Sequence, residues 1–78
     1  MSLVDRIDND FCYHKPTPEM LPKFQDLRER GRLLAHLIEQ TVPPGREQST
    51  ALTKLEEAIM WSNAGIARQG EKEKQDAN

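Results

Sequence analysis

The chain has 78 residues, 31% of them charged, and a net charge of only -2 at pH 7. That length allows one small domain, and the slightly acidic balance disfavours a general binder of DNA or RNA, which normally carries a basic surplus. No apolar run approaches the roughly 20 residues needed to cross a bilayer, and the amino terminus has no signal-peptide pattern. Because Cys12 is the single cysteine, the chain cannot form an internal disulfide, and Cys12 has no partner for a metal site of usual spacing. We therefore expect a soluble, intracellular, single-domain protein with no metal and no cofactor.

The amino-terminal part of the chain is predicted to be an extended arm. Residues 1–10 are mostly polar, and their few apolar positions have a spacing compatible with one or two helical turns. The next stretch, FCYHKPTPEMLPKF, contains prolines at positions 16, 18 and 22. Each proline fixes its own backbone and pushes the preceding residue out of the helical region. The arm is therefore expected to be extended or turn-like.

A first long helix is predicted from about Pro22 to Thr41. Asp26 and Arg30, four residues apart, are expected to pair on its surface. The sequence TVPPGREQS then breaks the helix because it contains two prolines and a glycine. One helix face is marked by residues that recur at steps of three and four: Phe24, Leu27, Gly31, Leu34 and Ile38, with Leu33, Ala35 and Leu37 widening the stripe.

A second long helix is predicted to begin within residues 44–49 and to end at Arg68 or Gln69, with Gly70 as its terminator. Its apolar stripe consists of Leu52, Leu55, Ile59 and Ile66. No strand pattern is present in the sequence. The predicted fold is all-α, an antiparallel two-helix hairpin with an extended N-terminal arm.

The hairpin domain is expected to span residues 1–69, followed by a disordered charged tail over residues 70–78. Two helices packed only on each other cannot cover all the large apolar side chains, so we predict an obligate oligomer. One face of the second helix carries small residues, which allow either a close neighbour or only the packing of the two helices: Ala51, Ala58, Ser62 and Gly65.

Three stretches give the chain a resemblance to a known family. The segment FCYHKP is similar to that family's aromatic-Tyr-His-Pro arm, and PKFQDLRERGRLLAHLIEQTVP is similar to its first long helix. The most specific stretch is PGREQSTALTKLEEAIMWSNAGIARQ, with an Arg-Glu-x-Ser start, a Leu-Glu-Glu-Ala centre and a Met-Trp-x-Asn-Ala-x-Ile-Ala-Arg end. Over residues 11–69 the chain thus resembles the small phage-encoded cyclic-nucleotide sponges that counter CBASS and Thoeris immunity.

The resemblance implies a function and an assembly. Sponges of this family are helical hairpins that form compact oligomers, hexamers in the anti-CBASS branch, and they bind cyclic oligonucleotide second messengers without cutting them. Cyclic dinucleotides such as cyclic GMP–AMP, and in some members glycocyclic ADP-ribose, occupy pockets shared by two protomers near the arm. Cyclic trinucleotides such as cyclic triadenylate occupy a pocket where three protomers meet. The resemblance therefore implies a homohexamer in the cytoplasm of a host bacterium, with no nucleic-acid polymer and no membrane as partner.

The arm and the start of the first helix supply candidates for the cyclic-dinucleotide pocket. Tyr13 is expected to stack on a base, although at least one of Tyr13 and Phe11 is also expected to pack the arm against the helices. His14 is expected either to donate to the ligand or to make a capping hydrogen bond. Lys23 and Arg28 are expected to reach the phosphates of a messenger stacked on Tyr13. The other arginines of that helix are expected to be solvated or paired: Arg30 and Arg32.

The start of the second helix supplies candidates for the cyclic-trinucleotide pocket. Arg46 and Thr50 lie four apart on one face, where the free N–H groups and the positive dipole end of a helix suit anions. An Arg and a Thr in this position resemble the phosphate contacts of the family's trimeric pocket. The alternative is that Ser49 or Thr50 only caps the helix and that Arg46 is solvated.

The end of the second helix supplies residues for a subunit interface or for the ligand. Trp61 lies off the centre of the apolar stripe and is expected to contact another subunit. Asn63 and Arg68 are expected either to satisfy polar groups at the same interface or to contact the ligand.

Two other classes of protein stay open as alternatives. For an enzyme, Cys12 and His14 project from the same side of an extended segment, but no third orienting group is evident. Glu56 and Glu57 are adjacent, so they diverge around the helix and form no two-metal site by themselves. A helical interaction module that masks a host protein would use the same hairpin in a helix-in-groove contact. The basic and aromatic arm favours a messenger-binding protein, not an enzyme, over both alternatives.

Overall fold

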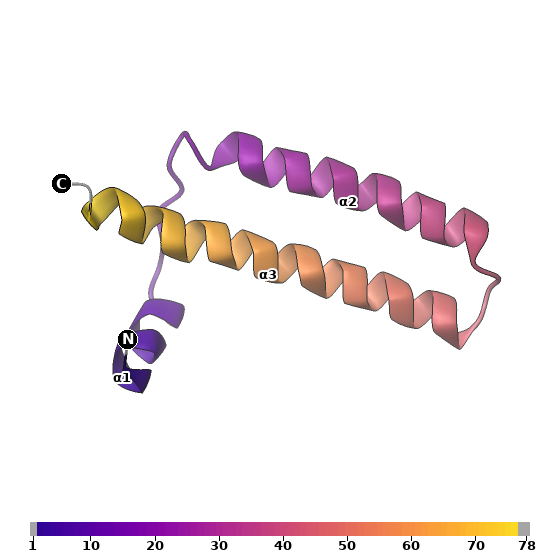
Figure 1. Ribbon diagram of the computed structural model, residues 1–78, viewed down its shortest axis with the longest axis horizontal. Helices are drawn as coiled ribbons and strands as arrows, with labels where there is room; N and C mark the ends of the chain where they lie inside the picture. The colour runs from indigo at the N-terminus through magenta and orange to yellow at the C-terminus, as the bar shows by residue number, and fades with distance from the viewer. Residues whose placement is uncertain (1, 77–78) are drawn as a thin grey trace.

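The computed structural model describes the backbone of residues 2–76 and the side chains of residues 2–69. Within these residues it contains three helices, α1 (Leu3–Asp10), α2 (Leu21–Thr41) and α3 (Arg46–Asp76), and no strand. The helices α2 and α3 form an antiparallel hairpin, and α1 lies below the carboxyl-terminal half of α3 (Figure 1). The all-α hairpin expected from the sequence is confirmed. In the described part of the chain, no helix has the length and apolar character that a membrane span requires.

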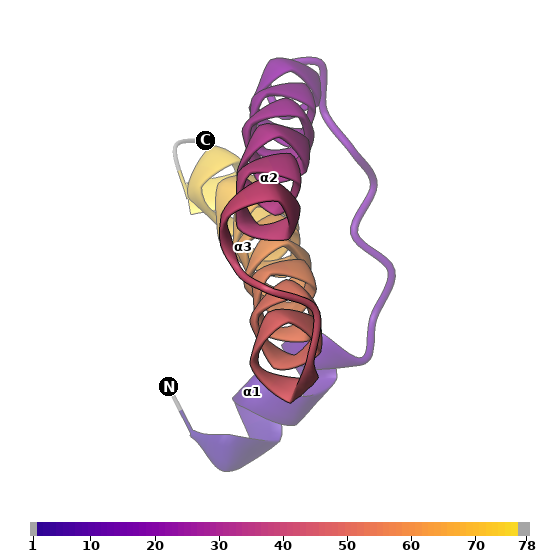
Figure 2. The ribbon, with the colours of Figure 1, turned by 90° about the vertical axis from the view of Figure 1, so that its right-hand side faces the viewer.

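The hairpin is a single layer of two helices. Seen along its length, α2 and α3 stack one above the other, while the arm, residues 11–20, runs down one side to α1 (Figure 2). The molecule measures 50 × 28 × 16 Å, so it is long and thin. Met20, at the start of α2, is 3% exposed and is the one described residue that is buried. A layer this thin has almost no interior of its own.

Local hydrogen bonds define α1, and packing contributes little to it. The Ser2 hydroxyl accepts a hydrogen bond from the Asp5 N–H at 3.1 Å, which is the N-cap arrangement. At the other end, the Phe11 N–H donates to the Ile7 carbonyl at 3.0 Å. No residue of α1 is buried. Its large apolar side chains are exposed: Leu3, Val4 and Ile7.

The contact between α2 and α3 is close at Gly31. A Cβ atom at this position would lie 3.0 Å from Cδ1 of Ile59, so the glycine lets the two helices approach. The predicted α2 stripe is partly wrong: Leu33, Leu34 and Leu37 are exposed. Ala35, which was expected to widen the stripe, does line the space between the helices. Consecutive residues of a helix differ by about 100° around its axis, so only one of Leu34 and Ala35 can face α3.

Gln48 fastens the turn between the two long helices. Its side-chain amide donates to the carbonyls of Glu39 and Val42, at 3.2 and 2.9 Å, and so satisfies acceptors at the end of α2. Because α3 begins at Arg46, the residues expected as alternative caps lie inside the helix, and the capping interpretation is wrong. These residues are Ser49 and Thr50.

The predicted end of the second helix is also wrong. The helix α3 passes through Gly70 and continues to Asp76, so residues 70–76 of the expected disordered tail are helical; residues 77–78 lie outside the described residues. Glu, Lys and Gln, which fill this stretch, are good helix formers. An interior glycine costs a helix only about 1 kcal/mol, which is too little to enforce a stop without a capping motif.

Candidate ligand-binding site

The aromatic side chains of the arm point away from the hairpin. Tyr13 is 82% exposed and Phe11 is 87% exposed, so the expectation that at least one of them packs the arm against the helices is wrong for the single chain. Backbone bonds such as Met20 N–H to the Thr17 carbonyl, at 3.0 Å, shape the arm locally. The arm therefore presents Tyr13 with an open ring, which is what base stacking requires.

His14 is bound to the end of α1. Its Nε2 lies 2.7 Å from the carbonyl oxygen of Asn9 and 3.5 Å from Sγ of Cys12. A carbonyl oxygen only accepts, so Nε2 must carry a proton to make the shorter contact. A protonated nitrogen cannot take the proton of the Cys12 thiol, so these two side chains do not form a nucleophile and base in this arrangement. Of the two roles expected for His14, this contact is the capping one.

Five cations among the described side chains are committed to carboxylates. The closest contacts are those of Arg30 with Asp26 at 2.8 Å and Arg32 with Glu29 at 2.6 Å, both predicted as paired or solvated. Hydrogen bonding to Asp26 raises the pKa of Arg30, and hydrogen bonding to Glu29 does the same for the pKa of Arg32. The Arg32 guanidinium in turn lowers the pKa of Glu29. The remaining pairs are Arg6–Asp10, Lys54–Glu57 and Arg68–Asp10.

The other lysines and arginines with described side chains make no ion pair with any described side chain. They include the three basic residues predicted to contact phosphates, Lys23, Arg28 and Arg46, together with Lys15. An unpaired guanidinium or ammonium can bind a phosphate without first giving up a carboxylate. The predicted basic phosphate ligands are thus among the cations that have no ion-pair partner in the described part of the chain.

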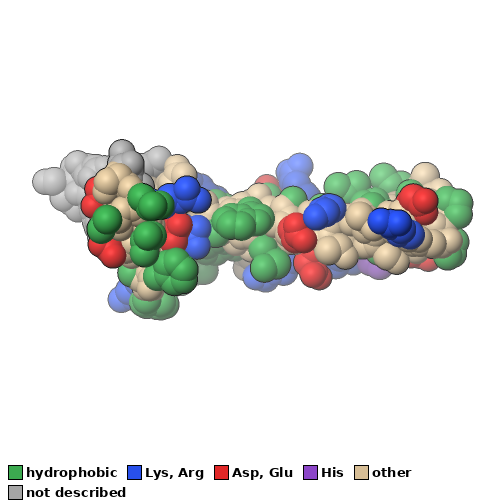
Figure 3. All heavy atoms as spheres, turned by 90° about the horizontal axis from the view of Figure 1, so that it is seen from below, with side chains coloured by type: hydrophobic (Ala, Val, Ile, Leu, Met, Phe, Trp, Pro, Cys, Tyr) green, Lys and Arg blue, Asp and Glu red, His purple; other side chains and the backbone are tan. Residues whose placement is uncertain are grey.

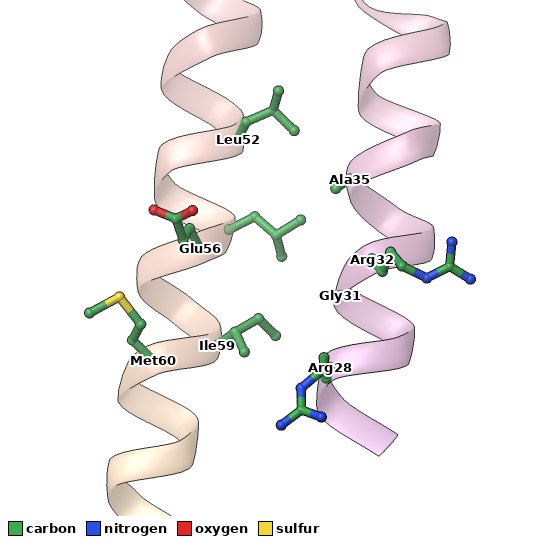
Figure 4. A pocket seen from close by; sticks show the side chains of 9 residues that line it. Arg28, Gly31, Arg32, Ala35, Leu52, Glu56, Ile59 and Met60 are labelled. Carbon is green, nitrogen blue, oxygen red and sulfur yellow. The ribbon is translucent and has the colours of Figure 1, made fainter. Parts of the chain in front are cut away.

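A groove of about 480 Å³ lies between α2 and α3. Leu52 and Ile59 project from α3 toward α2, and Arg28 extends from α2 toward α3 (Figure 4). The groove was not predicted, although Gly31 on α2 and Leu52, Leu55 and Ile59 on α3 belong to the two predicted apolar stripes. The small residues of α2 that face α3 were the sequence signal that could have indicated this groove. The full lining is Arg28, Gly31, Arg32, Ala35, Leu52, Leu55, Glu56, Ile59 and Met60.

The predicted ligand residues fall into two groups. Of the cyclic-dinucleotide candidates, only Arg28 lines the groove; Tyr13, His14 and Lys23 do not. The arm and the turn before α3 lie at opposite ends of the hairpin (Figure 1). Arg46, the first residue of α3, is exposed at the turn, as is Thr50 one helical turn later.

The three residues assigned to an interface or a ligand have different surroundings. Trp61 is 69% exposed, so most of its large apolar surface is open to solvent. Asn63 is half-buried, and its Oδ1 is buried without a hydrogen-bond partner. Arg68 joins α3 to α1 through Nη1, which lies 3.4 Å from Oδ1 of Asp10.

A thin helical hairpin that presents an open aromatic ring and unpaired cations is a small binding domain. The sequence model of the Acb2/Tad1 hairpin domain matches residues 4–67, most of the chain. The chain therefore belongs to the Acb2/Tad1 hairpin family, the family of anti-CBASS and anti-Thoeris sponges, and the resemblance seen in the sequence is confirmed. Searches of curated proteins and of solved structures gave no significant match.

Proposed function

We propose that this protein is a phage immune-evasion protein that binds cyclic oligonucleotide second messengers in the host bacterial cytoplasm and sequesters them uncleaved. The observation that carries the proposal is the pairing pattern of its cations. The fold neutralises Arg30 and Arg32 but leaves Lys23, Arg28 and Arg46 for an anionic ligand. Membership of a sponge family supports the same conclusion.

Two separate pockets are part of the proposal. Tyr13 would stack on a base of a cyclic dinucleotide or of glycocyclic ADP-ribose, with Lys23 and Arg28 on its phosphates. Arg46 and Thr50 would contact the phosphates of a cyclic trinucleotide such as cyclic triadenylate. The distance between the two ends of the hairpin (Figure 1) supports pockets that bind their ligands independently.

Subunit assembly is needed to complete these pockets. Tyr13 does not line the groove to which Arg28 contributes, so one chain does not surround a ligand on its own. The exposed Trp61 and the thin helical layer also favour assembly, and we propose a homohexamer. In such an assembly Trp61, Asn63 and Arg68 would lie at or near subunit contacts.

The proposal is tested by native mass spectrometry with cyclic GMP–AMP, cyclic triadenylate and glycocyclic ADP-ribose, each at several concentrations. The expected result is a hexamer that retains at least one of the three at a fixed number of sites. After denaturation, the bound messenger should be recovered intact. An assembly that retains none of them, or that releases a linear product, would contradict the proposal.

A second candidate function is the masking of a host protein. It is supported by an exposed leucine face on the outer side of α2, formed by Leu33, Leu34 and Leu37. The two functions differ in their response to excess messenger. A sponge loses its effect on a host effector once messenger exceeds its binding sites, whereas a protein that masks the effector keeps its effect.

A further inference from the structure

The helix α1 carries an apolar row that its own chain leaves uncovered. Leu3, Ile7 and Phe11 recur at steps of four, so they share one side of the helix, and all three are exposed. Hydrophobic and acidic side chains lie together over the end of the molecule that carries α1 (Figure 3). Among the described side chains, an ion pair between Asp10 and Arg68 links α1 to the hairpin. The apolar row thus takes no part in holding α1 in place.

The groove between α2 and α3 matches this row in length and in polarity. Its α2 wall runs from Arg28 to Ala35, about 10 Å at 1.5 Å per residue, and the row from Leu3 to Phe11 extends about 12 Å. Apolar side chains form the floor of the groove. Three charged residues belong to the lining, Arg28 and Arg32 on α2 and Glu56 on α3, and of these Arg28 extends toward the opposite helix (Figure 4).

The charges that flank the two surfaces are complementary. On α1, Arg6 precedes Ile7 and Asp8 follows it. The two charged residues therefore lie on opposite sides of the apolar row, each about 100° away from it around the helix axis. Asp8 has no ion pair with any described side chain, and neither has Arg28. With the row in the groove, Asp8 would face Arg28.

We propose that α1 of one copy docks its apolar row in the α2–α3 groove of a second copy. In its own chain α1 is held at Arg68, about 12 Å along α3 from the nearest groove residue, Met60. Each chain therefore carries both halves of the contact without joining them. Two copies related by a twofold axis form the contact twice, which closes the pair. This contact includes Arg28, which the proposed function also places on a messenger phosphate, so it is tested without any ligand.

Disulfide trapping between two differently tagged chains tests the proposal. Both chains carry Cys12→Ser; one also carries Ile7→Cys and the other Ala35→Cys. On mild oxidation, the mixture is expected to give a cross-linked heterodimer in large excess over a control in which Lys54→Cys, on an exposed position of α3, replaces Ala35→Cys. Cross-linking no greater than in the control would overturn the proposal. So would an internal disulfide alone in a chain that carries both cysteines.

A charge exchange provides the second test. Asp8→Arg or Arg28→Asp alone is expected to weaken self-association by about five- to tenfold, because each places like charges together at the border of the groove. Both changes in one chain should restore association toward the original value, as measured by analytical ultracentrifugation without messenger. Circular dichroism confirms that each variant is helical. If the double variant self-associates as weakly as either single variant, the pairing of Asp8 with Arg28 is overturned. If a variant loses its helices, the disulfide experiment decides whether the proposed contact forms.

Discussion

Individual side chains in this protein differ mainly in whether a neighbour has already engaged them. Arg30 and Arg32 each close on an acidic residue of the same helix, three or four positions away. Arg28, one helical turn earlier, has no such partner among the described side chains. The difference follows from the sequence, because carboxylates stand at positions 26 and 29 while position 24 is a phenylalanine and position 25 a glutamine.

Replacement of Tyr13 tests the exposed ring. Tyr13→Ala is expected to weaken binding of cyclic GMP–AMP by roughly 1–3 kcal/mol, the usual contribution of a base stacked on an aromatic ring. Tyr13→Phe keeps the ring and should bind nearly as well. Isothermal titration calorimetry measures both affinities. Unchanged binding by Tyr13→Ala would show that the ring does not contact the ligand.

Replacement of Arg46 tests the separation of the two pockets. Arg46→Ala is expected to weaken binding of cyclic triadenylate by roughly 1.5–3 kcal/mol, the range for a hydrogen bond to a charged group. Binding of cyclic GMP–AMP should not change, because the arm lies at the other end of the hairpin. Arg30→Ala is the matched control, since Asp26 already occupies that guanidinium. Equal losses for both messengers in Arg46→Ala would contradict two independent pockets.

At the scale of the helices, two glycines have different reasons to be present. Gly31 lies against Ile59, and a Cβ there would sit 3.0 Å from that side chain. At Gly65, a Cβ would meet no atom within 4 Å. The hairpin therefore requires the first glycine and gives no reason for the second. Ser62, on the same face as Gly65, donates to the Ala58 carbonyl at 2.7 Å and so meets its own hydrogen-bonding need within α3.

Alanine substitutions distinguish the two glycines. Gly65→Ala is expected to stabilise the protein by up to about 1 kcal/mol through helix propensity alone. Gly31→Ala has the same gain in helix propensity, but the new Cβ must displace Ile59. The Gly31→Ala variant should therefore be clearly less stable than the Gly65→Ala variant. Urea denaturation at one fixed protein concentration measures both free energies of unfolding. A loss of stability in Gly65→Ala would instead indicate that another chain packs against that glycine.

The sequence predicts the long helices well and their limits less well. Steps of three and four locate both apolar stripes, and Pro43 and Pro44 locate the turn. The choice between Leu34 and Ala35 depends on the rotation of α2 against its neighbour, which a one-helix pattern does not contain. The continuation of α3 past Gly70 depends on the weak cost of a single glycine. For the site, the sequence identifies suitable residue types. It does not show that Arg28 has no ion-pair partner in the described fold, or that Arg28 lies beside a groove.

At the scale of the whole molecule, stability is expected to depend on protein concentration. A layer of two helices with one buried described residue gains little from folding alone, so association should supply much of the stability. The midpoint of thermal unfolding, followed by circular dichroism, is therefore expected to rise as protein concentration increases. Addition of a bound messenger should raise it further. A midpoint that stays constant over a wide range of concentration would show that single chains are stable by themselves.

Met20 is the one buried residue among those described, and this has a consequence for the chain as it leaves the ribosome. Proteases cut backbone that opens easily, and a polypeptide with so little interior opens almost everywhere at once. We therefore expect a newly made copy to be short-lived until it associates with others, and the amount that survives to grow more steeply than the rate of synthesis.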